Sequence, residues 1–170
     1  MAGNQELLED LIYCARYGEF EDLKESKATP ELYITKDEDG NTALHMASAN
    51  NHLDIVNFIL EQLKTLGTEQ LNALVNVRNE QGNTPLHWAA LNGHLEVVKA
   101  LVSNGADCKT KNVVEKTPIY EAQQRGHEKI AEFFLDTMIE EEAKKDSDEE
   151  MDEDEQYVET GVPKEDPMKE

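Results

Sequence analysis

A chain of 170 residues has room for one domain, with some chain left over. Its 37 acidic residues outnumber its 16 basic ones, and the net charge of −21 argues against nucleic acid or an anionic membrane as a direct ligand and favours a basic partner. No apolar run is long enough to predict a membrane span, and the polar N-terminus predicts no targeting segment. Because the two cysteines make no disulfide framework, we expect a reducing compartment, most simply the cytoplasm or nucleus.

One motif recurs along the chain. Its fullest copy fills residues 82–98 and reads Gly-Asn-Thr-Pro-Leu-His-Trp-Ala-Ala-Leu-Asn-Gly-His-Leu-Glu-Val-Val, with further copies upstream and downstream and a weaker one aligned on Gly18. Thr84 and Thr117 lie 33 residues apart, whereas Thr42 and Thr84 lie 42 apart, so the second copy contains an insertion of nine residues. Such periods are typical of repeat proteins. The predicted repeats cover residues of about 5–33, 37–78, 79–111 and 112–139.

Each copy carries the signals of a tight turn followed by two helices. A glycine such as Gly82 gives the turn its backbone freedom. Thr84 is placed to cap a helix, and Pro85 falls in the first turn, where its missing N–H is not needed. Gly93 predicts the end of this helix, and the apolar spacing that follows predicts a second helix whose face must be buried by neighbouring repeats.

Two copies depart from the pattern. The insertion in the second copy has Thr68 ahead of Leu71, Leu74 and Val75, which predicts one or two extra helical turns capped by the threonine. In the last copy Glu115 replaces the turn glycine, so this finger is the least regular of the predicted turns.

The motifs Thr-Pro-Leu-His at 84–87 and Asn-Gly-Ala-Asp at 104–107 resemble those of the ankyrin-repeat family. The resemblance implies an all-α fold over residues 1–139, an ankyrin-repeat solenoid of about four repeats, each a helix-turn-helix plus a β-turn finger. Family members generally bind partners with a concave face made of the fingertips and the exposed side of the first helices.

Carried over residue by residue, the resemblance predicts a partner-binding face with Trp88 as its aromatic anchor, although Trp88 could instead pack between first helices. The face consists of Tyr13, Arg16, Tyr17, Glu38, Asp39, Asn41, Met46, Ala49, Asn50, Glu80, Gln81, Asn83, Trp88, Leu91 and Asn92, and the last repeat offers Val113, Val114, Lys116, Glu121, Gln124 and Arg125. Carboxylates at the tips with apolar residues behind them suit a basic amphipathic segment.

Residues 140–170 carry 15 acidic residues and 4 lysines, a net charge of −11. This segment has too few apolar residues for their burial to offset the conformational entropy lost on ordering, so we expect a disordered acidic tail. The tail could serve only for solvation, but its charge density favours a competitive shield for a basic client. Ser147 lies among acidic residues, which makes it a candidate phosphorylation site for an acidophilic kinase.

No catalytic residues, metal site or cofactor are predicted. The five histidines occupy ankyrin consensus positions, where the family uses them for hydrogen bonds to the backbone between repeats. Cys14 and Cys108 fall where the motif has small buried side chains, and most carboxylates lie in the tail, where nothing raises their pKa. The sequence therefore predicts a binding protein, monomeric on its own, and not an enzyme.

The enlarged second repeat, the sequence Thr-Ala-Leu-His-Met-Ala followed by Thr-Pro-Leu-His-Trp-Ala, and the acidic tail together resemble one branch of the family. It comprises yeast-type ankyrin-repeat chaperones that escort a newly made KH-domain ribosomal protein of the small subunit. The resemblance implies a protein of the cytoplasm and nucleus that keeps a basic client soluble until ribosome assembly. Two alternatives stay open: an ankyrin adaptor or inhibitor in signalling or transcription, and an acidic histone-type chaperone.

Overall fold

The computed structural model describes the backbone of residues 2–165 and the surroundings of the side chains from residue 3 to residue 147. The chain forms two compact units, residues 1–132 and residues 133–170. Within residues 2–165 all regular elements are helices and no strand is present, which confirms the predicted all-α class. The division falls earlier than residue 139, where composition places the end of the repeat domain, and that boundary stays a prediction.

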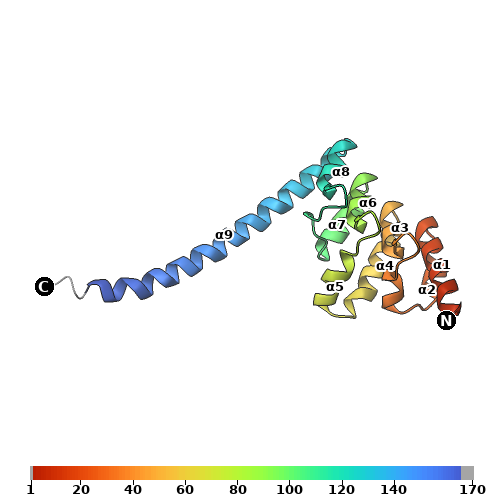
Figure 1. The fold of residues 1–170 in the computed structure, drawn as a ribbon, viewed down its shortest axis with the longest axis horizontal. Helices are drawn as coiled ribbons and strands as arrows, with labels where there is room; N and C mark the ends of the chain where they lie inside the picture. Colours follow the sequence, from red (N-terminus) through yellow and green to blue (C-terminus); the bar gives the residue numbers. More distant parts are fainter. Residues whose placement is uncertain (1, 166–170) are drawn as a thin grey trace. The chain divides into compact units, whose positions relative to one another are not determined.

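The first unit is a stack of helix pairs joined by extended fingers (Figure 1). The first helices of the pairs, α1, α3, α6 and α8, contact one another in succession, and the second helix α4 packs against α7. The helices of both units, in chain order, are α1 (Ala2–Tyr17), α2 (Phe20–Glu25), the short 3-10 helix η1 (Pro30–Ile34), α3 (Ala43–Ala49), α4 (Leu53–Lys64), α5 (Thr68–Val75), α6 (Pro85–Leu91), α7 (Leu95–Ser103), α8 (Pro118–Gln124) and α9 (Glu128–Glu165).

Threonine N-caps begin α3, α6 and α8, as the sequence predicts from Thr84. The Thr84 hydroxyl accepts a hydrogen bond from the backbone N–H of His87, and the His87 ring accepts one from the Thr84 N–H, so two otherwise unpaired donors are satisfied. Thr42 and His45 make the same pair of bonds in α3. The residue after the C-cap has positive φ in both helices, Gly93 after α6 and Asn51 after α3.

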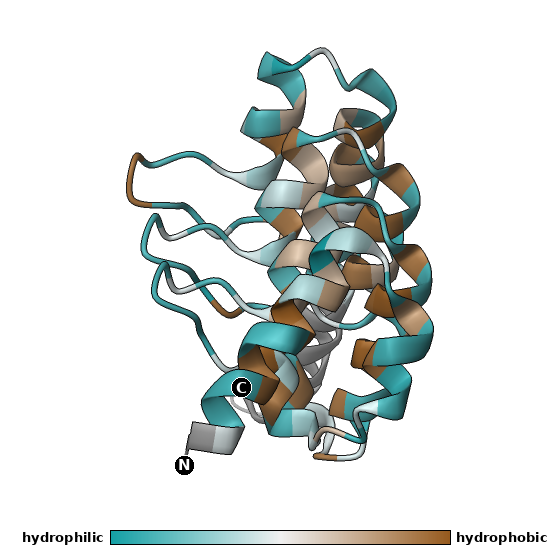
Figure 2. Cartoon of the chain, turned by 90° about the vertical axis from the view of Figure 1, so that its right-hand side faces the viewer, coloured by the Kyte–Doolittle hydropathy of each residue, from teal (hydrophilic) through white to brown (hydrophobic). Residues whose placement is uncertain are grey.

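The core of the first unit runs between the two rows of helices. Leu44 and Leu86 of the first helices and Ile59 and Leu101 of the second are fully buried. In Figure 2 the hydrophobic side of many helices is turned toward the neighbouring helices, while the fingers are largely hydrophilic. No single repeat could bury this much apolar surface alone, so the stack holds together through contacts between neighbours.

The insertion in the second repeat forms α5, but its start differs from the prediction. The N-cap residue is Gly67, with φ of 105°, and the helix begins at Thr68 without a side-chain cap. The helix buries Leu71 and Val75. Asn76, which follows it, donates to the Gly105 carbonyl oxygen at 3.0 Å and accepts from the Asp107 N–H at 2.7 Å, so the insertion is held against the loop after α7.

The sequence predicts a disordered tail from residue 140. In the structure the backbone of α9 continues through this tail as far as Glu165. All side chains from residue 140 to residue 147, including the candidate phosphorylation site Ser147, are exposed. A helical stretch with no packed face, such as residues 140–147, is held by its own backbone hydrogen bonds alone and is marginal in water. The composition argument, that this tail has too little apolar surface for a packed structure, agrees with that exposure.

Candidate protein-binding face

Three fingers of the first unit have the same turn. They are residues 37–41, 79–83 and 112–116, and the backbone N–H of the first residue of each donates to the carbonyl oxygen of the last at 2.8–3.0 Å. The first residue is Asp37, Asn79 or Asn112, and its side-chain oxygen accepts from two further N–H groups of its own turn. The fingertips are therefore fixed by local hydrogen bonds that do not use the tip side chains.

Neighbouring fingers are bonded to each other at a fixed spacing. The Glu80 N–H donates to the Asp39 carbonyl oxygen at 3.2 Å, and the Asn79 side-chain amide donates to the Asn41 side-chain oxygen at 2.8 Å. A side chain at Gly40 would place its Cβ 2.8 Å from the Glu80 nitrogen, so glycine is needed for this approach as well as for its φ of 77°.

The last finger repeats these contacts without the glycine. Its Val113 N–H donates to the Gln81 carbonyl oxygen at 3.0 Å, and Asn112 donates to the Asn83 side-chain oxygen at 2.8 Å. Glu115 takes the left-handed conformation with φ of 62°. Within residues 2–165 no further finger packs against it, so its Cβ does not meet the close backbone contact that Gly40 and Gly82 avoid.

All five histidines bond the backbone of an adjacent repeat. The Nε2 atom of His45 lies 2.8 Å from the Asn83 carbonyl oxygen, and that of His87 lies 3.0 Å from the Lys116 carbonyl oxygen. His52, His94 and His127 make the same kind of bond to the carbonyl groups at or near the ends of the preceding first helices. The structural role predicted for these residues is confirmed.

The bonds define the protonation state of two of these rings. Nδ1 of His45 accepts from the Thr42 N–H, so the ring proton lies on Nε2 and is donated to Asn83. Burial lowers the pKa of His45 to about 4, and it also lowers the pKa of His87. Both rings are therefore neutral at pH 7. In the described residues no group of three or more His, Cys, Asp or Glu could hold a metal ion.

A hollow of about 340 Å³ lies where the first two fingers meet α6. It is lined by Asp39, Asn41, Asn79, Glu80, Gln81 and Trp88. The Trp88 ring is half-buried and lies edge-on to the His45 ring, with centroids 6.3 Å apart, so one part of it packs between first helices while another part faces the hollow. The predicted packing between first helices and the predicted position on the binding face therefore each describe part of the surroundings of Trp88.

A second hollow, of about 290 Å³, shares Asp39 with the first. It is lined by Gln5, Glu9, Asp37, Glu38 and Asp39. Neither hollow has a lysine or arginine in its lining, so no cationic side chain of the wall neutralises the carboxylates. Such a surface has a negative potential that attracts cationic groups.

Most of the predicted face is accessible. Tyr13, Arg16, Tyr17, Glu38, Asp39, Asn50, Glu80, Gln81 and Asn92 are exposed, and Ala49, Asn83, Trp88 and Leu91 are half-buried. In the last repeat Val113, Val114, Gln124 and Arg125 are exposed, and Lys116 and Glu121 are half-buried.

Two residues of the predicted face have buried side chains, although Asn41 also lines the first hollow. Asn41 is 7% exposed, since its amide is bonded to Asn79 of the next finger. Met46 is 3% exposed, and its sulfur lies 3.6 Å from an Arg16 guanidinium nitrogen, which covers it. Conversely, sequence reasoning missed Gln5, Glu9 and Asp37 in the second hollow. Asp37 could have been found, because it aligns with Asn79 and Asn112.

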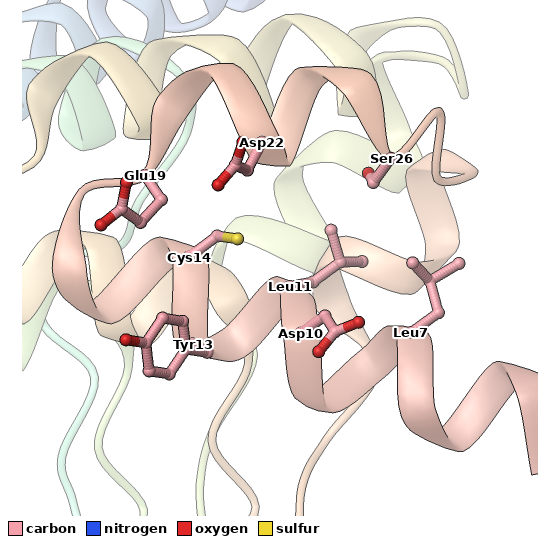
Figure 3. A pocket seen from close by; sticks show the side chains of 8 residues that line it. All are labelled: Leu7, Asp10, Leu11, Tyr13, Cys14, Glu19, Asp22 and Ser26. Atoms are coloured by element: carbon pink, nitrogen blue, oxygen red, sulfur yellow. The ribbon is translucent and has the colours of Figure 1, made fainter.

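Tyr13 lies at a different hollow, of about 590 Å³ between α1 and α2 (Figure 3). It is lined by Leu7, Asp10, Leu11, Tyr13, Cys14, Glu19, Asp22 and Ser26. Burial, reinforced by the carboxylates of Asp22, Asp10 and Glu19, raises the pKa of the Cys14 thiol. The thiol is therefore held in its protonated form, which is a poor nucleophile.

No helix in the described part of the chain is apolar over a length that could cross a bilayer.

Stacked helix pairs, fingers joined by backbone and amide bonds, and histidines that link the repeats are the features of an ankyrin-repeat domain. The family of ankyrin repeats (3 copies) matches residues 11–112. This chain belongs to the ankyrin-repeat family.

Two relatives and one solved structure show how close the relationship is. An ankyrin repeat-containing protein of Schizosaccharomyces pombe is 46% identical over 133 residues, covering 78% of this chain and 86% of the relative. Ankyrin repeat-containing protein YAR1 of Saccharomyces cerevisiae is 42% identical over 139 residues, covering 78% and 70%. A chain in the crystal structure of the yeast ribosomal protein Rps3 in complex with its chaperone Yar1 matches with a TM-score of 0.74 and 41% identity, covering 78% of this chain and 93% of that chain.

Proposed function

We propose that this protein is a non-enzymatic chaperone of a basic small-subunit ribosomal protein, the counterpart of Rps3. It binds the newly made client and shields it in the cytoplasm and nucleus until delivery for ribosome assembly. The similarity to a chain of the Rps3–Yar1 complex supports this choice of client. The net charge of −21 supports a basic client independently of that similarity.

The observation that carries the proposal is the first of the two hollows, the one of about 340 Å³ that Trp88 lines, which we call the acidic hollow. Asp39 and Glu80 lie on neighbouring tips bonded at a fixed spacing, and the indole forms part of the same wall. A lysine or arginine of the client can place its charge between the carboxylates and its aliphatic stem against the ring. The rigid turns mean that little order has to be gained on binding.

The same geometry supports a binding role over a catalytic one. The buried thiol of Cys14 has a raised pKa, and the neutral rings of His45 and His87 have both nitrogens engaged in bonds to the protein. Neither kind of group is available as a nucleophile or a general base in this arrangement.

The test is binding of purified Rps3 to the wild type and to the double variant Asp39→Lys/Glu80→Lys. Charge reversal should weaken binding several-fold and should increase Rps3 aggregation, measured by light scattering. The melting temperature should change little, because the bonds of the two turns use backbone groups and the side chains of Asp37 and Asn79.

The matched control is Glu25→Lys/Glu69→Lys, which changes the net charge equally at exposed positions of α2 and α5. It should bind Rps3 nearly as well as the wild type. Equal loss in both variants would mean that only overall charge matters and would contradict a site at the fingertips. Affinity purification from cell extract gives a second test: recovery of a kinase, a transcription factor or histones in place of the ribosomal protein would favour the alternative functions.

A further inference from the structure

The tip residues change in character along the row of fingers. In each turn the two tip residues follow the anchoring Asp37, Asn79 or Asn112. They are Glu38 and Asp39 in the first finger, Glu80 and Gln81 in the second, and Val113 and Val114 in the third. The first two tips are acidic and the third is apolar, although the backbone bonds of all three are the same.

The two valines are not needed for the turn in which they occur. Val113 is 63% exposed and Val114 is 62% exposed. The bonds of this finger use their backbone N–H groups and the side chain of Asn112. Figure 2 shows one finger that is hydrophobic at its tip among otherwise hydrophilic fingers. Two adjacent β-branched side chains left in water at the end of a rigid loop suggest a binding contact.

The apolar tip is continuous with the acidic hollow. Val113 is bonded through its N–H to Gln81, which lines that hollow. Behind the valines, the Lys116 ammonium lies 5.3 Å from the centroid of the Tyr120 ring, which is 39% exposed and adds a further apolar group to this end of the row of fingers. One bound segment can therefore contact carboxylates at one end of the row and apolar groups at the other.

We propose that Val113 and Val114 hold an apolar part of the same client whose basic side chains lie over the first two tips. This inference rests on the proposed function. The row then binds its client segment in a single direction, with the cationic part at the first two fingers and the apolar part at the third. A second copy of this chain does not fit the row, since it would bring further carboxylates against Glu38, Asp39 and Glu80.

The test transplants the tip of the second finger onto the third, with Val113→Glu/Val114→Gln. The turn accepts this pair, because Glu80 and Gln81 occupy the same positions in the same bonded turn. If charge alone attracted the client, an added carboxylate would tighten binding. The proposal expects affinity for purified Rps3 to fall about tenfold, the loss expected for one valine side chain buried on binding, and by a similar factor at low and high salt.

Two comparisons keep the result interpretable. A decalysine peptide has no apolar side chain and should bind the transplanted variant at least as tightly as the wild type. Val113→Thr/Val114→Thr keeps the β-branched shape and should lose part of the affinity for Rps3 without added charge, in case the first variant is unstable. Rps3 binding that is unchanged or tighter in both folded variants overturns the inference.

The outcome is separable from that of the proposed function. If Asp39→Lys/Glu80→Lys weakens Rps3 binding and the valine variants do not, only the apolar contact is wrong. If the wild type itself fails to bind Rps3, the proposed function is wrong.

Discussion

Individual polar residues bind the repeats together, and the buried histidines show this most clearly. His45 accepts a bond from Thr42 in its own helix cap and donates one to Asn83 in the next finger, so a single ring links two repeats. Its removal from water is compensated only while the ring is neutral, since a protonated ring could no longer accept at Nδ1.

We therefore expect stability to fall as the pH is lowered below 6.5. The pKa of His45 is about 4 in the folded protein against 6.5 for an ordinary histidine, so between these values the unfolded chain binds a proton that the folded one does not. His45 alone should remove about 2 kcal/mol between pH 7 and pH 5, and the lowered pKa of His87 acts in the same direction. Urea unfolding at several pH values measures this.

His45→Gln serves as the control for this titration. The variant should be less stable than the wild type at pH 7, but its stability should vary less with pH between 5 and 7. Parallel curves for the two proteins would assign the pH dependence to other groups.

The side-chain hydroxyl of Ser48 is not required for the repeat to fold. Its hydroxyl is buried without a hydrogen-bond partner in the described part of the chain, and the equivalent position of the next repeat is Ala90. Ser48→Ala removes the unpaired group and favours the helix, so it should stabilise the domain by about 1 kcal/mol. Thermal unfolding should show a higher melting temperature.

The matched variant is Ser26→Ala, in which the lost hydroxyl donates to the Leu23 carbonyl oxygen at 2.6 Å. That variant should gain no stability. A Ser48→Ala protein that is less stable than the wild type would show that the hydroxyl has a partner in solution.

At the scale of elements, each helix is specified locally but held by its neighbours. α6 has seven residues and α7 has nine, lengths at which isolated helices do not persist in water. Their stability comes from the apolar side of α7 packed against α4 and from the bonds that link adjacent repeats. We therefore expect the packed helices to depend on one another for their stability.

Leu101→Ala tests this dependence on packing. Leu101 lies in α7 and is completely buried, so the variant should lose about 2–5 kcal/mol of unfolding free energy. Lys99→Ala in the same helix removes only a surface ion pair with Glu96, at 3.7 Å, and should change stability by less than about 1 kcal/mol. Client binding should fall in the first variant only in proportion to the unfolded fraction. A selective loss of binding at full stability would place Leu101 at the interface.

At the scale of the whole molecule, the negative charge is divided between the repeats and the acidic tail. Residues 140–170 carry −11 of the total of −21. Charges that are solvated act over a screening length of about 8–10 Å at ordinary salt, so they speed the encounter with a basic client more than they slow its release. Packed groups such as Trp88 slow the release of the client more than they speed its encounter, because their contacts form only in the complex.

Deleting residues 140–170 should therefore lower the rate of association with Rps3, and the loss should shrink as salt is added. Trp88→Ala should mainly raise the dissociation rate, and it should do so at every salt concentration. Stopped-flow measurements on both variants at low and high salt provide the comparison.

The alternatives give different results in this experiment. A histone-type chaperone would lose nearly all binding with the tail and little with Trp88, whereas a signalling adaptor would tolerate deletion of the tail at any ionic strength.

Much of the fold could be predicted because its signals lie within a few residues of each other. Thr84 and His87 cap one helix, Gly93 ends it, and the apolar spacing of the next helix follows directly. The repeat period then fixes which helices are neighbours. The valine pair at 113–114 was visible in the sequence as well, but its meaning depended on knowing that the turn around it is the same as in the other fingers.

The sequence by itself determined the repeat, its caps and turns and the acidic balance that favours a basic partner, because each depends on local bonding or on composition. The tertiary structure decided which face residues are accessible: Asn41 is buried by Asn79, 38 residues later, and Met46 is covered by Arg16, 30 residues earlier. It also decided that Asp39, Glu80 and Trp88 line one hollow. Burial and cavities arise where distant segments stack, and the spacing of residues along one chain does not specify how closely two repeats approach.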